Sequence, residues 1–296
     1  MKKIIITTDS NSGISQAEAA RLGIHVLPMP FYINGQLYLE DLTLSQPEFY
    51  RFLEQEAEIS TSQPSIAAVT ELWDKALESC DEIVHIPMSS GLSSSCETAM
   101  FLAESDYPGR VWVVDNKRIS WSLKQSVLEA MALAQQGTEG QKIKALLEQY
   151  SLESSIYVAV DTLKYLKKGG RITPAAASIG AVFNIKPVLQ IQGGKLDAFA
   201  KVRGMKQARA TMIEAAQADL AGRFAGSPVY LRAAYTCSEE DALDWKKQLE
   251  EQFPGYDIYM DRLSFSVTCH TGPGAVAVVC CKQLPETGFL AYTPME

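Results

Sequence analysis

The sequence has few of the residues that build metal sites or disulfide frameworks. Its 296 residues include six cysteines, none in a Cys-x-x-Cys pair, and three histidines that do not fall at zinc-ligand spacing. We therefore expect no structural metal. We expect the cysteines to be isolated buried thiols in a reducing compartment.

Basic residues and long apolar runs are also scarce. Lys and Arg number 27 against 35 Asp and Glu, which gives a net charge of −8 and a pI near 5.1. Nucleic-acid binding rests on basic surface, so the composition argues against it. No apolar run reaches the length of a membrane span, and Ile4–Ile6 is too short for a signal-peptide core. These features predict a cytoplasmic protein.

Nucleotide-binding loops are absent as well. Gly193-Gly194-Lys195 lacks the remaining spacing of a P-loop, and no Gly-x-Gly-x-x-Gly opens a helical pattern. We expect neither a nucleotide site nor a cofactor on this chain.

What the sequence does have is an alternation of short apolar runs with longer helical patterns. Continuous apolar runs are typical of strands buried on both faces of a parallel sheet. Three such runs end in polar residues: Ile4–Thr7 before Asp9, Ile83–Ile86 before Ser89, and Val111–Val114 before Asp115. Because ligand crevices in open α/β sheets lie at the carboxyl ends of strands, a binding site is expected there.

The chain is long enough for two domains. Helical patterns at about 119–134 and 141–150 close the first half, and the turn-like segment 151–155 follows. We predict an α/β protein with a mainly parallel N-terminal domain (1–153) and a smaller C-terminal α/β domain (154–296). Asn34-Gly35 and Gly193-Gly194 each predict a hairpin.

A cluster of five serines lies between a predicted strand and a predicted helix. The serines occupy five of the seven positions from Ser89 to Ser95, and Thr61-Ser62-Gln63-Pro64-Ser65 precedes another helical pattern. The N-terminus of a helix attracts anions, and hydroxyl groups add donors. Ser and Thr are also common helix N-caps, but one cap needs only one hydroxyl. We interpret the cluster as a ligand site.

A nucleophilic role for the same serines is an alternative. Gly91-Leu92-Ser93-Ser94-Ser95 approaches the Gly-x-Ser-x-Gly elbow of hydrolases but lacks its last glycine. A hydrolase would also need a base, for which His270 in a predicted tight loop is the candidate. His270 could equally be a loop residue that hydrogen-bonds a backbone carbonyl. Labelling of Ser93 by a fluorophosphonate would support the hydrolase.

Two arginines lie beside glycines. Arg171 follows Gly169-Gly170, and Arg203 precedes Gly204. Such positions suit phosphate or carboxylate recognition, because the backbone can approach closely. They also suit helix C-termini, where positive charge is favoured.

Taken together, these segments resemble the DegV family over nearly the whole chain. The resemblance rests on six motifs in this order: Thr8-Asp9-Ser10, Thr61–Ser65, Ser89-Ser90-Gly91-Leu92-Ser93, Tyr165–Ile172, Lys201-Val202-Arg203-Gly204 and His270-Thr271-Gly272-Pro273-Gly274. Two segments depart from the family pattern: Ser94-Ser95 stands where the family usually has Gly-Thr, and Asp115-Asn116 stands where it usually has Asp-Ser.

The resemblance implies a two-domain α/β protein that binds one long-chain fatty acid of the palmitate, stearate or oleate type between its domains. Such proteins serve as the non-catalytic fatty-acid-binding (FakB) component of bacterial fatty acid kinase. A separate ATP-binding subunit phosphorylates the bound carboxylate, and the acyl phosphate feeds phospholipid synthesis. Transient contact with a membrane surface is also compatible with this role.

The resemblance also implies roles for particular residues. Thr61, Ser62 and Ser93, with the adjacent Ser94 and Ser95, would bind the carboxylate, and His270 would join the same hydrogen-bond network. Arg171 and Arg203 would lie near the head group or on the face that docks the kinase subunit. Alternatives to a kinase component are a passive lipid carrier and a serine hydrolase or acyltransferase that uses Ser93 and His270.

Overall fold

The computed structural model describes residues 2–55, 57–178 and 185–292. The chain divides into two compact units. The first covers the described residues of Met1–Leu152 and Leu284–Glu296, and the second is Glu153–Gln283. The predicted division placed everything after residue 153 in the second domain, whereas residues 284–292 belong to the first unit.

The first unit is built on a parallel four-stranded sheet of order β2-β1-β6-β7. Its strands are β1 (Ile4–Asp9), β2 (His25–Leu27), β6 (Glu82–Ile86) and β7 (Val111–Val113). All five residues of β6 are buried, as expected for a central parallel strand with both faces covered. The parallel pairing places the carboxyl ends of β1 and β6 side by side.

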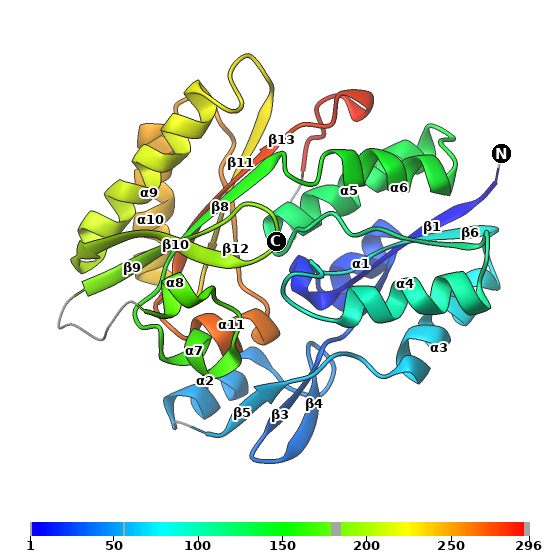
Figure 1. Cartoon of the computed structure of the whole chain (residues 1–296), viewed down its shortest axis with the longest axis horizontal. Helices are drawn as coiled ribbons and strands as arrows, with labels where there is room; N and C mark the ends of the chain where they lie inside the picture. The colour runs from blue at the N-terminus through cyan, green and yellow to red at the C-terminus, as the bar shows by residue number, and fades with distance from the viewer. Residues whose placement is uncertain (1, 56, 179–184, 293–296) are drawn as a thin grey trace. The chain divides into compact units, whose positions relative to one another are not determined.

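Helices cover both faces of this sheet (Figure 1), with α3 and α4 on one face and α5 and α6 on the other. A core around the fully buried Trp73 joins α3 and α4 to the sheet. The helical elements of the unit are η1 (Ser10–Ser12), α1 (Gln16–Leu22), α2 (Gln46–Glu54), α3 (Ile66–Leu77), α4 (Ser95–Asp106), α5 (Trp121–Gln135), α6 (Gly140–Gln149) and η2 (Pro285–Thr287).

A small antiparallel sheet of order β4-β3-β5 completes the first unit. Its strands are β3 (Pro30–Ile33), β4 (Gln36–Leu39) and β5 (Ile59–Thr61). The predicted hairpin at Asn34-Gly35 is the β3–β4 turn, and both residues adopt positive φ, as a two-residue hairpin turn requires.

The second unit has a six-stranded mixed sheet of order β10-β9-β8-β13-β11-β12. Its strands are β8 (Ser154–Ala159), β9 (Ile185–Ile191), β10 (Leu196–Arg203), β11 (Val229–Tyr235), β12 (Tyr259–Arg262) and β13 (Val276–Lys282). The second predicted hairpin is the antiparallel pair β9 and β10, with Gly193 and Gly194 at positive φ.

The helices of the second unit are α7 (Lys164–Gly169), α8 (Pro174–Ala177), α9 (Gly204–Ala221), α10 (Glu239–Gln252) and α11 (Phe265–Thr271). A core that includes Met212, Phe224 and Trp245 lies between the sheet and the pair α9 and α10, which run beside each other in Figure 1. The fold class is thus α/β, as predicted. None of the helices within the described ranges is long and apolar enough to cross a membrane.

Candidate functional site

The serine loop, residues Ser89–Ser95, connects the carboxyl end of β6 to α4 and is anchored by the neighbouring strand β1. Thr8 Oγ1 donates to the carbonyl of Ile86 at 2.7 Å, and the N–H of Met88 donates to Asp9 Oδ2 at 2.8 Å. The other oxygen of Asp9 accepts both the backbone N–H of Asn11 at 2.9 Å and its side-chain amide at 3.0 Å. Asp9 therefore holds the residue before the serine loop through Oδ2 and the segment after β1 through Oδ1.

Burial raises the pKa of Asp9 to about 6, against the opposing effect of its hydrogen bonds to Met88 and Asn11. The folded pKa lies above the unfolded value near 4, so the folded state binds a proton first as the pH falls. Asp9 therefore adds stability that is present at low pH and is lost as the pH rises through about 6.

We expect wild type to gain about 1.4 kcal/mol relative to Asp9→Asn between pH 7.5 and pH 5. Urea unfolding of both ligand-free proteins at each pH measures this difference, and other carboxyl groups cancel in the comparison. A difference that stays constant over this range would contradict the assigned pKa.

The N–H groups of the serine loop are largely used inside the loop itself. The N–H of Gly91 donates to Ser89 Oγ at 3.1 Å, and those of Leu92 and Ser93 donate to the Ser89 carbonyl at 3.0 and 3.2 Å. The N–H of Ser95 donates to Ser93 Oγ at 3.2 Å. Because Ser93 Oγ already accepts this bond, its own proton is free to point at an anion. The loop therefore leaves hydroxyl groups, more than backbone N–H groups, available as hydrogen-bond donors.

Ser94 and Ser95 open α4. Ser94 occupies the N-cap position, is exposed, and makes no side-chain cap bond. Its φ of −72° is ordinary, so the backbone does not require the glycine that the family usually has here. Ser95 Oγ is buried and has no hydrogen-bond partner in the described part of the chain. A buried hydroxyl without a partner is costly, which favours a ligand or water at this point.

The structure brings the second hydroxyl stretch close to the first. Thr61 ends β5 and Ser62 follows it, with the N–H of Ser62 donating to the Pro30 carbonyl at 3.3 Å. Thr98 Oγ1, in the first turn of α4, donates to the side-chain oxygen of Gln63 at 3.4 Å. Thr61 and Ser62 are half-buried, as are Ser93 and Ser95. Within the stretch, Ser65 caps α3 by accepting the N–H of Ala68, so it is the serine with the structural role.

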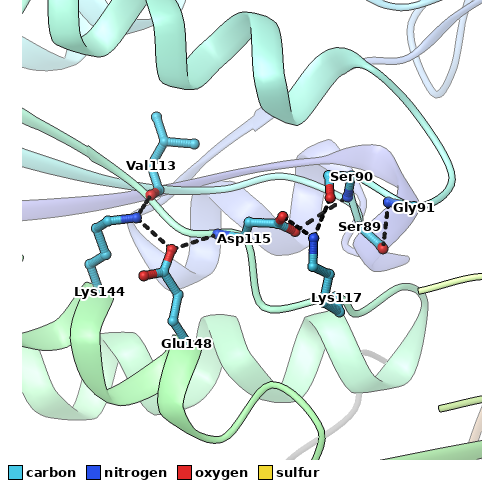
Figure 2. A network of polar contacts seen from close by, with 8 residues as sticks. All are labelled: Ser89, Ser90, Gly91, Val113, Asp115, Lys117, Lys144 and Glu148. Atoms are coloured by element: carbon cyan, nitrogen blue, oxygen red, sulfur yellow. Dashed lines mark hydrogen bonds and ion pairs between the residues drawn. The ribbon is translucent and has the colours of Figure 1, made fainter. Parts of the chain in front are cut away.

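A polar network that sequence reasoning missed supports the loop from the end of β7 (Figure 2). Lys117 is ion-paired with Asp115 and donates to Ser90 Oγ, while the N–H of Ser90 donates to Asp115 Oδ1 at 3.3 Å. Burial raises the pKa of Asp115, but the hydrogen bonds from Lys117 and Ser90 outweigh it and lower the pKa overall. The sequence identified Asp115 as a polar strand end but gave no sign that Lys117 would fold back onto it.

His270 lies in the last turn of α11 and not in a loop as predicted. Its imidazole packs directly on the backbone of Gly169, where an added Cβ would come within 2.1 Å of His270 Nδ1. Burial, together with the charge of Arg171, lowers the pKa of His270 to about 4. The side chain is therefore neutral near pH 7, and it can donate or accept hydrogen bonds but cannot form an ion pair.

The two arginines occupy different environments. Arg171 is half-buried and donates to the Gly169 carbonyl at the end of α7, so it fills the helix C-terminal role that was one of its two predicted interpretations. Arg203 is exposed at the end of β10 and occupies the N-cap position of α9 without a cap bond. A cation is unfavourable at a helix N-terminus, so the helix does not explain Arg203.

His85 of the first unit does not supply a base for the serine loop. His85 is buried in β6, its Nδ1 lies 2.8 Å from Thr7 Oγ1, and its ring packs edge-on against Trp73. Burial lowers the pKa of His85 to about 3. Its contacts are those of a core residue. In the described ranges, no three His, Cys, Asp or Glu side chains are grouped to hold a metal.

The structure is thus a two-unit α/β protein with a cluster of hydroxyl side chains at strand ends in its first unit. The chain belongs to the DegV family, since the model of the "Uncharacterised protein, DegV family" matches residues 3–283. The family expected from the sequence motifs is confirmed.

Similar proteins match more than nine-tenths of the chain. A DegV domain-containing protein from Deinococcus radiodurans is 34% identical over 279 residues, which cover 93% of this chain and 97% of that protein. Two solved structures, both described as fatty acid binding, are also similar. The DegV family protein from Thermus thermophilus is 29% identical with a TM-score of 0.86, and DegV from Bacillus subtilis is 25% identical with a TM-score of 0.83. Each match covers 96% of this chain and 100% of the other.

Proposed function

We propose that this chain binds one long-chain fatty acid and places its carboxylate on the hydroxyl groups of Ser93, Ser94, Ser95, Thr61 and Ser62. The observation that carries the proposal is the donor set of the serine loop. Ser93 Oγ accepts the N–H of Ser95 and keeps its proton for the ligand, while Ser95 Oγ is buried without a partner in the described residues. The fatty-acid-binding proteins of the same family, from Thermus thermophilus and Bacillus subtilis, support the choice of ligand.

The acyl tail supplies most of the affinity. A tail of about 14 methylenes, at ~0.8 kcal/mol each, gives roughly 11 kcal/mol of transfer free energy. Association opposes this with about 4 kcal/mol or more. The hydroxyl groups therefore decide which end of the ligand lies at the serine loop.

We further propose that the chain is not itself an enzyme and presents the carboxylate to a separate ATP-binding kinase subunit. Neutral donors hold a carboxylate without cancelling its charge, so an oxygen remains nucleophilic. That oxygen attacks the γ-phosphorus of ATP on the partner, a new O–P bond forms, and ADP leaves. We assign the neutral His270 to hydrogen bonding at the head group, and Arg171 and Arg203 to the head group or to the kinase subunit.

The first test is to extract the purified protein under denaturing conditions and identify the released lipid by mass spectrometry. We expect a stoichiometric C14 to C18 fatty acid. Ser93→Ala removes a charge-assisted hydrogen bond of about 1.5–3 kcal/mol, so the Kd for palmitate should rise about 10- to 100-fold. Ser105→Ala, in the last turn of the same helix, is the matched control and should retain the lipid.

No lipid in wild type, and no uptake of added oleate or palmitate, would overturn the binding proposal. The kinase role needs its own test, in which lipid-loaded protein is incubated with ATP and a fatty acid kinase catalytic subunit. Trapping of acyl phosphate with hydroxylamine supports that role. A bound fatty acid that is never phosphorylated would identify a passive carrier.

A further inference from the structure

Lys117 is a cation beside the serine loop for which the proposed function gives no role. Its ammonium donates to Ser90 Oγ and is ion-paired with Asp115 (Figure 2). An ammonium group has three N–H donors, so these two contacts leave one. The Lys117 side chain is 36% exposed, so that donor is accessible to a ligand.

Local geometry keeps this ammonium close to the candidate anion site. Ser89 accepts the N–H groups of both Leu92 and Ser93, so residues 89–93 form one helical turn. Ser90 and Ser93 are three residues apart in that turn and lie on the same side, with Cβ atoms about 5–6 Å apart. The Lys117 ammonium therefore donates to Ser90, a residue that lies next to Ser93 in the turn. The charges of Asp115 and Lys117 also both act on Cys96, in the first turn of α4.

The backbone and the Asp115 anchor fix where Lys117 points. Lys117 has a φ of +58°, a left-handed conformation that is unfavourable for lysine and is common at functional sites. The N–H of Asp115 donates to Glu148 Oε1 at 3.1 Å, and Lys144 binds both Glu148 and the Val113 carbonyl. Asp115 is thus held by its own neighbours in α6, and it keeps Lys117 against the loop.

We propose that Lys117 binds the phosphoryl group of the phosphorylated ligand and makes the site prefer an acyl phosphate over the free fatty acid. This inference rests on the proposed function. A carboxylate carries one negative charge, which neutral hydroxyl groups can hold. A phosphoryl group carries roughly 1.5 to 2 charges near pH 7 and presents three strong acceptor oxygens. Lysine acts on such a group as a point charge, and the free N–H of Lys117 is positioned to do so.

The test compares two ligands with the same tail, palmitate and hexadecyl phosphate, the latter a stable mimic of the acyl phosphate. Their affinities are measured by displacement of a fluorescent fatty acid from delipidated protein, below the micellar concentration. In Lys117→Gln, the affinity for hexadecyl phosphate should fall about 10-fold and that for palmitate less than about threefold. Lys117→Arg keeps the charge and should retain most of the preference.

Lys142→Gln is the matched control, because it removes an exposed lysine charge from α6, outside the network. It should change neither affinity by more than about twofold. Equal losses for both ligands in Lys117→Gln would show that Lys117 only supports the loop, and unchanged affinities would likewise overturn the inference. If Lys117→Gln does not fold, the affinities of wild type for both ligands are measured at increasing salt concentration. The inference then requires that the affinity for hexadecyl phosphate fall more steeply than that for palmitate. A wild type that binds neither ligand overturns the proposed function itself.

Discussion

Replacing Lys124 with methionine is expected to lower the free energy of unfolding by about 3 to 5 kcal/mol. Lys124 and Glu18 form an ion pair at 2.9 Å, and their side chains are only 2% and 6% exposed. The ammonium also lies 4.7 Å from the ring centroid of Trp121 and 4.8 Å from that of Tyr292. Methionine fills most of the space but leaves the Glu18 carboxylate buried without its cation, which is the main cost. Urea unfolding of ligand-free protein measures the loss.

A double variant separates the cost of the unpaired charge from the value of the pair. Glu18→Gln with Lys124→Met removes both charges and should recover most of the stability, because buried ion pairs contribute little net stability. The exposed pair Lys246–Glu250 is the control, with side chains 38% and 50% exposed. Lys246→Met should cost less than about 0.5 kcal/mol. A Lys124→Met variant as stable as wild type would show that Glu18 finds other compensation.

Hydrogen bonds to Glu18 and to Glu129 explain why residues 284–292 belong to the first unit. The Tyr292 hydroxyl donates to Glu18 Oε1 at 2.9 Å, and the N–H of Leu284 donates to Glu129 Oε1 at 3.1 Å. Glu18 lies on α1, which follows the end of β1, and Glu129 lies on α5. The final segment therefore ties together α1, which packs on β2, and α5, which packs on the strand β1 that anchors the serine loop. Tyr292 and Glu18 are 274 positions apart, so no local pattern could predict the contact.

The elements that the sequence predicted well are those with a strong local signal. The apolar run of β6 and the Asn34-Gly35 turn each specify one structure without help from distant residues. Helix α11 was missed, because Phe265–Thr271 is rich in Ser, Thr and Val and has only seven residues. Such residues have low helix propensity, and α11 forms by packing on α7.

In the candidate site too, the part with a local sequence pattern could be predicted and the part that depends on distant contacts could not. Strand-end serines before a helix are a local pattern, and Ser93 and Ser95 have the hydroxyl donors that the proposed ligand requires. The role of Lys117 depends on a positive φ and on Asp115, and the neutrality of His270 depends on burial against Gly169. These features come from tertiary packing between distant residues, which no local sequence pattern reveals.

Replacing Gly272 with alanine is expected to destabilise the second unit by about 2 to 6 kcal/mol. Gly272 ends α11 with a φ of +73°, and a Cβ there would lie 2.3 Å from Tyr165 Cδ2 on α7. With a ψ of 179°, this positive φ lies in a region that essentially only glycine occupies, which costs an alanine about 1–3 kcal/mol. Forcing apart a packed ring costs about 1–3 kcal/mol more. Thermal or urea unfolding, followed by a probe in the second unit, measures the loss.

Gly170→Ala is the control for a positive φ without a steric clash, because Gly170 is left-handed, with φ +67° and ψ 21°, and has nothing within 4 Å of an added Cβ. It should cost about 1–2 kcal/mol, the conformational part alone. Tyr165→Ala should then partly rescue Gly272→Ala but add independently to Gly170→Ala, since only the first pair is in contact. Equal costs for the two glycine variants would mean that the Tyr165 ring moves freely. The contact between α7 and α11 would then be too loose to hold His270 against Gly169, and the lowered pKa of His270 would need another cause.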